Sequence, residues 1–375
     1  MTQLRISQSE RYNTKMHSPC LSVIRDMIQQ KGVLSFAEFM MLALYHPQYG
    51  YYCRENFALG RWGDFITAPL LSPLFGACLA KPCQQTIEKL GGADILECGA
   101  GTGELAIAIL QTLAAEKSLP THYYIYEISQ SLKEKQRKAL STHLPRHLFE
   151  RCVWLDTLPP SFQGVILANE VLDALPVHCF AITEAGIKER CIGWEEDHLA
   201  WHLTQPLTPG LKEAVQTLKA TYHLPTPYQS EINLGLADFI QPLARALQKG
   251  IMLFIDYGYE QNEYYHPLRQ QGTLTCFYQH RHHDDPLALP GLQDITAHVD
   301  FTRVIESAEQ CGCEVTEFTT QALFLLNCGL REMAIKKEAS LNEREKFTLR
   351  QALKTLLLPT EMGERVKVLT LSKNL

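Results

Sequence analysis

The stretch ILECGAGTGELAIAIL, from Ile95 to Leu110, decides the fold. It contains a short apolar run, then a turn with Gly99, Gly101 and Gly103, then a segment with strong helical character. Glycines in such a turn let the backbone reverse tightly and bring peptide N–H groups against a ligand. We therefore expect a strand, a ligand-binding turn and a helix, which together begin an α/β fold.

The alternation continues along the chain. Further strand-like runs and helical patterns follow one another: Tyr123 to Tyr126, a helix near Gln130 to Leu140, Cys152 to Leu155, Val165 to Ala168, and Ile251 to Ile255. Strands that alternate with helices predict βαβ units and a mostly parallel sheet. The runs Cys313 to Phe318 and Val366 to Leu371 are expected to return to the sheet edge as an antiparallel pair.

The chain has 375 residues, which predicts about two globular units or one large domain with insertions. We expect four regions: an N-terminal helical region with an active-site loop (1–90), the first part of an α/β core (91–177), an inserted β-rich, substrate-facing region (178–232), and the second part of the core (233–375), with a loop insertion at about 259–302.

The composition narrows the class of protein. Lys+Arg 35 and Asp+Glu 41 give a net charge of −6, which argues against a basic nucleic-acid-binding protein. No apolar run reaches the length of a membrane span, and the first residues lack a secretory apolar core, so we expect a cytoplasmic protein. Arg5, Arg11 and Lys15 leave a mitochondrial presequence, and hence the matrix, as the alternative. The 12 cysteines are scattered without a CxxC pair and are predicted to be reduced.

Two carboxylates flank the glycine turn. Glu104 stands where a dinucleotide-binding turn needs a small residue, and Glu97 lies at the end of the preceding strand. Carboxylates here would repel a pyrophosphate and suit a cationic ligand without phosphates, such as S-adenosylmethionine. A nicotinamide-dependent oxidoreductase is the disfavoured alternative, because it requires the small residue that Glu104 replaces.

Acidic residues also follow the next two strands. Glu127 is placed to accept both ribose hydroxyls of a nucleoside, and it lies 127 − 99 = 28 residues beyond the first glycine, whereas a dinucleotide fold would place it nearer to about 20. Asp156 is placed to meet the adenine edge, and Asn169 and Thr67 are further candidates for cofactor contacts. The alternative is a structural glycine turn with surface carboxylates.

The methyl acceptor is expected beside the segment NEVLDALPVH, residues 169–178. Glu170 could hold a guanidinium bidentately and orient one of its nitrogens. A carboxylate cannot deprotonate the guanidinium before the transfer, because the pKa of the guanidinium is too high. Asp173 could be a second clamp or the route for proton loss, or it could simply cap the following turn. Asp256, in the run DYGY, could line the acceptor pocket or bind backbone amides.

Two loops remain open to interpretation. The segment Gly60 to Gly76, with Asp64 as a candidate catalytic residue, has the composition of a lid over a ligand, or of an ordinary surface loop. The run QHRHHDDP, residues 279–286, invites a metal site, but consecutive residues cannot all converge on one ion. We expect no metal and interpret the run as a solvated loop or part of a protein-substrate groove.

The chain resembles the MidA-type methyltransferases, which include the mitochondrial complex I assembly methyltransferase and bacterial relatives. The motifs that carry the resemblance, in order, are HPQYGYY (46–52), GDFITAP (63–69), ECGAGTGELA (97–106), YEISQSLKEKQ (126–136), NEVLDALPVH (169–178), SEIN (230–233), DYGY (256–259), DITAHVDFT (294–302) and EMGERVKVL (361–369). GDFITAP and NEVLDALPV are specific, whereas many methyltransferases share the glycine turn.

The resemblance implies a seven-stranded class I methyltransferase fold with an added substrate-facing region, and S-adenosylmethionine as cofactor. It also implies symmetric ω-N dimethylation of an arginine in a respiratory complex I subunit. Gly99, Gly101 and Gly103 would form the cofactor turn, Glu127 would contact the ribose, and residues 63–69 would form part of the active-site wall.

One position departs from the family pattern. Where relatives commonly have an acid after the proline of GDFxTxP, this chain has Leu70. If that acid contacts the guanidinium, Glu170 must do more of the work, or the protein is a weakly active assembly chaperone that keeps the cofactor fold. The GAGTG form of the turn favours the bacterial branch, and the sequence leaves a homodimer open.

Overall fold

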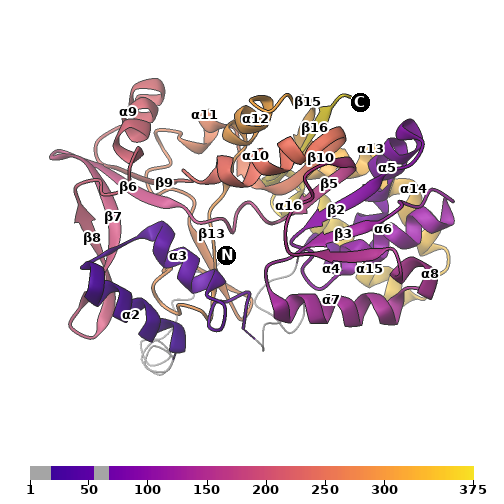
Figure 1. Ribbon diagram of the computed structural model, residues 1–375, viewed down its shortest axis with the longest axis horizontal. Coiled ribbons are helices and arrows are strands. Elements are labelled where there is room, and N and C mark those ends of the chain that lie inside the picture. The colour runs from indigo at the N-terminus through magenta and orange to yellow at the C-terminus, as the bar shows by residue number, and fades with distance from the viewer. Residues whose placement is uncertain (1–17, 55–66) are drawn as a thin grey trace. The chain divides into compact units, whose positions relative to one another are not determined.

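The computed structural model describes residues 18–54 and 67–375. By their contacts, these residues divide into two compact units (Figure 1). Among the described residues, unit 1 comprises 18–54, Asp173–Ala237 and Tyr259–Thr302, and unit 2 comprises 67–172, Asp238–Gly258 and Arg303–Leu375. Each unit is therefore made of three separate segments of the chain. The boundaries of the four regions expected from the sequence stay predictions.

Unit 2 contains the large sheet. Its strands are β2 (Asp94–Cys98), β3 (Tyr123–Tyr126), β4 (Cys152–Leu155), β5 (Phe162–Asn169), β10 (Leu247–Tyr259), β15 (Glu314–Thr320) and β16 (Val366–Lys373). They follow the order β15-β16-β10-β5-β2-β3-β4. The five strands from β10 to β4 are parallel, while β16 is antiparallel to both β10 and β15. The predicted mostly parallel sheet and the antiparallel C-terminal pair are thus confirmed.

Helices accompany these strands in unit 2. They are α4 (Ala68–Leu71), α5 (Pro73–Leu90), α6 (Glu104–Ala115), α7 (Gln130–His143), α8 (Arg146–Phe149), α10 (Leu236–Ala246), α12 (Phe301–Glu309), α13 (Gln321–Asn327), α14 (Leu330–Glu338), α15 (Glu343–Leu357) and α16 (Met362–Arg365). The helix α6 begins directly after Gly103, in the segment for which the sequence predicted a helix. Leu105, Ile109 and Leu113 of this helix are buried and recur at helical spacing, so they form a stripe in the core.

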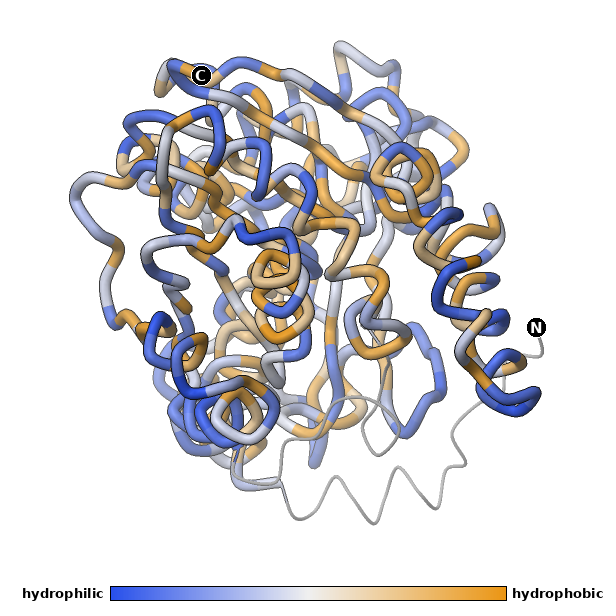
Figure 2. The backbone as a smooth tube through the Cα atoms, turned by 90° about the vertical axis from the view of Figure 1, so that its right-hand side faces the viewer, coloured by the Kyte–Doolittle hydropathy of each residue, from blue (hydrophilic) through white to orange (hydrophobic). Residues whose placement is uncertain are grey.

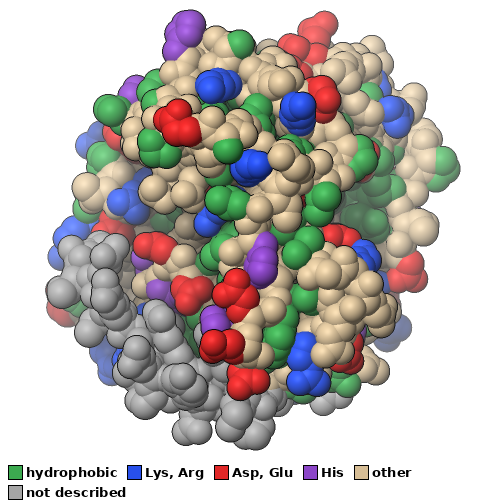
Figure 3. All heavy atoms as spheres, turned by 90° about the vertical axis from the view of Figure 1, so that its left-hand side faces the viewer, with side chains coloured by type: hydrophobic (Ala, Val, Ile, Leu, Met, Phe, Trp, Pro, Cys, Tyr) green, Lys and Arg blue, Asp and Glu red, His purple; other side chains and the backbone are tan. Residues whose placement is uncertain are grey.

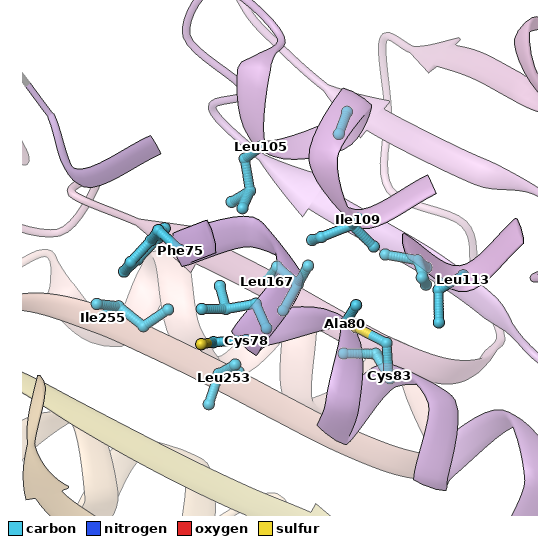
Figure 4. Close-up of a cluster of buried hydrophobic side chains, with 14 of the residues drawn as sticks. Phe75, Cys78, Ala80, Cys83, Leu105, Ile109, Leu113, Leu167, Leu253 and Ile255 are labelled. Atoms are coloured by element: carbon cyan, nitrogen blue, oxygen red, sulfur yellow. The ribbon is translucent and has the colours of Figure 1, made fainter. Parts of the chain in front are cut away.

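The core of unit 2 lies between α5, α6 and the sheet. Figure 4 shows Leu105 and Ile109 of α6 beside Phe75 of α5, with Leu167 and Leu253 contributed by the strands below them. All of these side chains are buried. Alternate residues of β5 and β10 enter this core, because successive side chains of a strand point to opposite faces.

Unit 1 is built on a smaller antiparallel sheet. Its strands follow the order β1-β7-β6-β9, with β8 paired to β7. The bounds are β1 (Leu34–Ser35), β6 (His178–Thr183), β7 (Gly186–Glu195), β8 (His198–Thr204) and β9 (Tyr228–Ile232), with helices α2 (Pro19–Lys31), α3 (Phe36–Tyr45), α9 (Leu211–Tyr222) and α11 (Gln261–Tyr264). Strands β6 to β9 occupy the region that the sequence predicted to be β-rich.

A three-stranded sheet, of order β12-β11-β13, lies in the stretch for which the sequence predicted a loop. Its strands are β11 (Thr275–Tyr278), β12 (Arg281–His283) and β13 (Asp294–Thr296), and the short β14 (Val299–Asp300) follows. These strands are too short and too polar for an alternating pattern to be recognised from sequence. Beside them the buried Glu231 accepts hydrogen bonds from the N–H of Thr273 (2.8 Å) and the hydroxyl of Tyr264 (2.8 Å).

Blue and orange residues alternate around the helices in Figure 2, as expected for helices with one face on a core. On the face in Figure 3, basic side chains are scattered among acidic ones.

All 12 cysteines are free, as predicted. Across residues 18–54 and 67–375, every helix falls short of the length and hydropathy of a membrane span.

Candidate active site

The predicted cofactor residues lie level with one another at the carboxyl edge of the large sheet. Cys98 is in register with Tyr126 of β3 and with Ala168 of β5, and Tyr126 is in register with Leu155 of β4. The next residue of each strand is, in that order, Gly99, Glu127, Asn169 and Asp156. Ligands of open α/β sheets bind at this edge, so the register brings these four candidates to one place.

The glycine turn uses the conformational freedom of its glycines. Gly99, Gly101 and Gly103 have φ values of 65°, 53° and 96°, which other residues adopt only with strain. The turn is also tightly packed. A Cβ at Gly103 would lie 2.5 Å from Cδ1 of Leu140, and one at Gly99 would lie 2.9 Å from Cγ2 of Val171. The turn therefore cannot take side chains at these positions without rearrangement.

Glu97 is a buried carboxylate beneath the turn. It is 2% exposed, and the hydroxyl of Tyr123 donates a hydrogen bond to it at 2.8 Å. Burial, reinforced by the negative charges of Glu104 and Glu127, raises the pKa of Glu97 to about 7. A buried acid that titrates near neutrality gains from a cationic neighbour, because a nearby positive charge favours the ionised form.

Glu127 is held in position by the helix that follows it. One carboxylate oxygen accepts the N–H of Ser129 (2.9 Å) and the other accepts Nε2 of Gln136 (3.1 Å). Gln136 is fixed in turn, because its Oε1 accepts Nε1 of Trp154 and its Nε2 also donates to the carbonyl of Gly101 (2.9 Å). A carboxylate has about four acceptor positions, so Glu127 keeps capacity for a diol. Burial raises its pKa.

Asp156 lies at the predicted place, but its side chain is 84% exposed and pairs with Nζ of Lys133 at 2.5 Å. This hydrogen bond and charge lower the pKa of Asp156. The ammonium of Lys133 is buried, so the pair fixes a cation beside the nucleoside edge of the sheet. The proposed contact of Asp156 with an adenine must therefore coexist with this ion pair.

Glu170 has an unusual backbone. It directly follows β5 with a φ of 52°, a region that costs most L-amino acids of order 1–2 kcal/mol. Its N–H donates to the carbonyl of Ile255 (2.8 Å), and its Oε1 accepts the N–H of Ala68 (3.2 Å) and Nδ2 of Asn169 (3.1 Å). Strained non-glycine residues at the ends of strands concentrate at functional sites.

Asp256 holds the turn that carries Glu170. Its Oδ2 accepts the N–H groups of Val171 (3.0 Å) and Leu172 (2.8 Å), and its Oδ1 accepts the N–H of Tyr257 (2.8 Å). The side chain is 1% exposed. Of the two roles that the sequence left open for Asp256, the contacts within unit 2 favour the binding of backbone amides.

The residues present fit S-adenosylmethionine. Oδ1 of Asn169 is buried, and in the part of the chain that the structure describes no donor reaches it. A buried acceptor without a donor is costly, which suggests that a ligand supplies one. The α-amino group of the methionine moiety is such a donor. With Asn169, the glycine turn and Glu127 would hold the amino-acid part and the ribose, and Glu97 would add negative charge.

The remaining candidates are less closely defined. Thr67 precedes α4 and makes no side-chain capping bond, while the next N–H, that of Ala68, binds Glu170. Asp173 belongs to unit 1, where it is buried and its carbonyl accepts the N–H of Ala297 (2.9 Å). Asp64 lies outside the described residues. The roles proposed for all three stay predictions.

The histidine run forms part of a hairpin rather than a loop. His282 and His283 lie on β12, which pairs with β11, and Nε2 of His282 is 3.6 Å from Oδ1 of Asp284. Within residues 18–54 and 67–375 no group of three or more His, Cys, Asp or Glu side chains is arranged to hold a metal ion.

Sequence reasoning missed Gln136, Lys133 and the N–H of Ala68. Gln136 and Lys133 lie three residues apart on α7, so they share a helix face. The position of these two polar residues on one face of the helix that follows Glu127 was the sequence signal for their role. A backbone N–H carries no signal of its own, so the contact between Ala68 and Glu170 needed coordinates.

The fold and this edge of the sheet define a class I S-adenosylmethionine-dependent methyltransferase. The chain belongs to the family of S-adenosyl-L-methionine-dependent methyltransferases whose model matches residues 78–319. Two groups of relatives extend this assignment along nearly the whole chain.

The first relative is a solved structure from Burkholderia thailandensis, crystallised with S-adenosyl-homocysteine. It is 34% identical, has a TM-score of 0.88, and is matched over 99% of this chain and 96% of that one. The second group carries the name protein arginine methyltransferase NDUFAF7, mitochondrial. The Danio rerio protein is 28% identical, over 94% of this chain and 86% of its own, and the Homo sapiens protein is 27% identical, over 93% and 82%.

Proposed function

We propose that this methyltransferase modifies a guanidinium nitrogen of an arginine in a protein, and that the product is the symmetric ω-N-methylated form. The observation that carries the proposal is Glu170, a carboxylate presented in a strained backbone at the carboxyl end of β5. The name of the NDUFAF7 relatives, protein arginine methyltransferase, supports the same acceptor.

Glu170 suits a guanidinium better than it suits a neutral acceptor. A carboxylate matches the planar fork of guanidinium N–H groups, and such pairs are bidentate and charge-assisted. The contacts that Glu170 already makes, with Ala68 and Asn169, fix its position before an acceptor arrives. Positioning of this kind can lower a barrier by about 7–11 kcal/mol when the reacting atoms are aligned.

Methyl transfer to a guanidinium nitrogen depends on the orientation of the nitrogen more than on acid–base catalysis. S-adenosylmethionine supplies an activated methyl group when it is bound. As the new N–C bond forms at the guanidinium nitrogen, the C–S bond breaks and its electrons stay on sulfur. The methylated guanidinium then loses one proton and keeps a single positive charge. In our proposal Glu170 draws charge away from the reacting nitrogen, and Asp173 is the second clamp or the route for that proton.

The protein substrate proposed here is a respiratory complex I subunit or a similar protein, acted on in a bacterial cytoplasm. The mitochondrial matrix is the alternative compartment, since the NDUFAF7 relatives are named mitochondrial. A homodimer remains a further proposal.

Transfer of labelled methyl groups tests the acceptor. Lysate from a strain that lacks the gene is incubated with the purified protein and S-adenosylmethionine carrying a labelled methyl group, and the labelled protein is hydrolysed to amino acids. We expect label in symmetric dimethylarginine, reduced about 10- to 100-fold when Glu170→Gln replaces the wild type. Label confined to lysine, to a carboxylate or to a small molecule would contradict the proposal.

The chaperone alternative rests on Leu70, which lies within α4. Complementation separates it from the enzyme. The chaperone hypothesis holds if a Gly101→Val variant restores assembly of the partner complex as well as the wild type does, while the arginine of the substrate protein stays unmodified. Methyl transfer would then be dispensable for assembly.

A further inference from the structure

A cavity lies within unit 2, and the glycine turn does not line it. It has a volume of about 810 Å³ and is bordered by the start of α5, the second half of α6, and the hairpin of α14 and α15. This volume falls within the range of roughly 300–1,000 Å³ that small-molecule pockets occupy. None of the candidate cofactor residues lines it.

The floor of the cavity is apolar. Leu71, Leu74 and Ala77 border it on one side, Ala108 borders it from α6, and Leu349 borders it from α15. These side chains are buried or half-buried, and three of the five are leucines. Such a floor fits an apolar ligand chain, since burial of each methylene strengthens binding.

The polar groups of the wall are mostly engaged within the protein. The hydroxyl of Ser72 accepts the N–H of Leu74, and that of Thr112 donates to the carbonyl of Ala108 (2.8 Å). The carboxylate of Glu345 accepts the N–H of Asn342 (3.0 Å) in a capping box at the start of α15. These groups therefore have little capacity left for a ligand.

Two cations at the rim are different. Lys337 lies in the last turn of α14 and Arg344 in the first turn of α15. Both line the cavity, and both are exposed. Their neighbours Arg350 and Lys346 form ion pairs with Glu338 and Glu343, whereas among residues 18–54 and 67–375 the side chains of Lys337 and Arg344 show no ion pair. The rim thus offers positive charge above an apolar floor.

We propose that this cavity binds an amphipathic anion, namely a carboxylate with an unbranched alkyl chain such as a fatty acid. The chain would lie along the floor, and the carboxylate would meet Lys337 and Arg344. The wall continues directly into α4, whose first N–H binds Glu170, so an occupant would lie against the segment that positions the candidate clamp.

Titration calorimetry with dodecanoate below its micelle concentration tests the proposal. We expect one site, weakened about tenfold when decanoate, with two fewer methylenes, replaces dodecanoate. Dodecanol, which keeps the chain and lacks the charge, is expected to bind at least tenfold more weakly. A shallow surface would show neither dependence.

Variants locate the site. Ala115→Trp, at an exposed lining position, is expected to abolish binding, and the pair Lys337→Glu with Arg344→Glu is expected to weaken it at least tenfold. Ala339→Trp and Lys336→Glu, exposed positions outside the lining, serve as matched controls and are expected to bind as the wild type does.

Affinity for S-adenosylhomocysteine reports whether each variant is folded, and Thr348→Trp replaces Ala115→Trp if that variant does not fold. No binding of dodecanoate to the wild type would overturn the proposal. It would also be overturned if lining and control variants lost affinity equally, or if dodecanol bound as tightly as dodecanoate.

Discussion

Replacement of Glu97 by glutamine should make the protein more stable at high pH. The carboxylate is 2% exposed, and burial raises its pKa from 4.5 to about 7. The folded state therefore binds the proton of the Glu97 carboxyl more tightly than the unfolded state does. This tighter binding stabilises the wild type fully below about pH 4.5, and the stabilisation is lost as the pH rises through 7. This rise of the pKa corresponds to roughly 3 kcal/mol of stability.

Glutamine keeps an acceptor for the hydroxyl of Tyr123 and cannot ionise. We therefore expect Glu97→Gln to match the wild type within about 1 kcal/mol at pH 5 and to exceed it by up to about 3 kcal/mol at pH 8. Urea unfolding at pH 5, 6, 7 and 8 measures the difference, and Glu116→Gln, at an exposed position on the end of α6, is the control. A difference independent of pH would refute the reasoning.

Four further outcomes follow from the site. Gly101→Val should lower affinity for S-adenosylhomocysteine at least tenfold in calorimetry, because valine is strained at a φ of 53°, while Gly91→Val, at a φ of 69° with open space around it, should leave affinity unchanged. Glu127→Gln should weaken binding of the same ligand by about 10- to 100-fold, as for the loss of charged hydrogen bonds to a diol; equal affinity would exclude the proposed ribose contact. Asp256→Ala should lower the free energy of unfolding by about 2–5 kcal/mol, since it leaves buried N–H groups without acceptors, and Asp256→Asn should cost less; the reverse order in chemical unfolding would contradict the role given to Oδ2. Glu170→Gln should lower methyl transfer about 10- to 100-fold with unchanged affinity for S-adenosylhomocysteine, and a parallel loss of both would mean that Glu170 acts on the cofactor instead.

The elements around the glycine turn could be predicted from sequence because local and long-range signals agree there. Strand β2, the turn and α6 each have their own period, and the positive φ values fall on glycines. Once the sheet is parallel, the strand ends place Glu127, Asp156 and Asn169 at one edge without further information.

The support of the site could not be predicted in the same way. Asp256 lies 86 residues after Glu170, and its bonds run to backbone N–H groups, which leave no trace in the sequence. The left-handed backbone of Glu170 breaks a local preference and is held by tertiary contacts. The ion pair of Asp156 likewise depends on Lys133, a partner on another element.

The most direct test of the cofactor site is a crystal structure of the protein with S-adenosylhomocysteine. We expect the ribose hydroxyls on the carboxylate of Glu127, the amino group near Oδ1 of Asn169, and the ligand backbone against Gly99 to Gly103. A ligand bound in another crevice, with this turn unchanged and without contact, would contradict the assignment of the site.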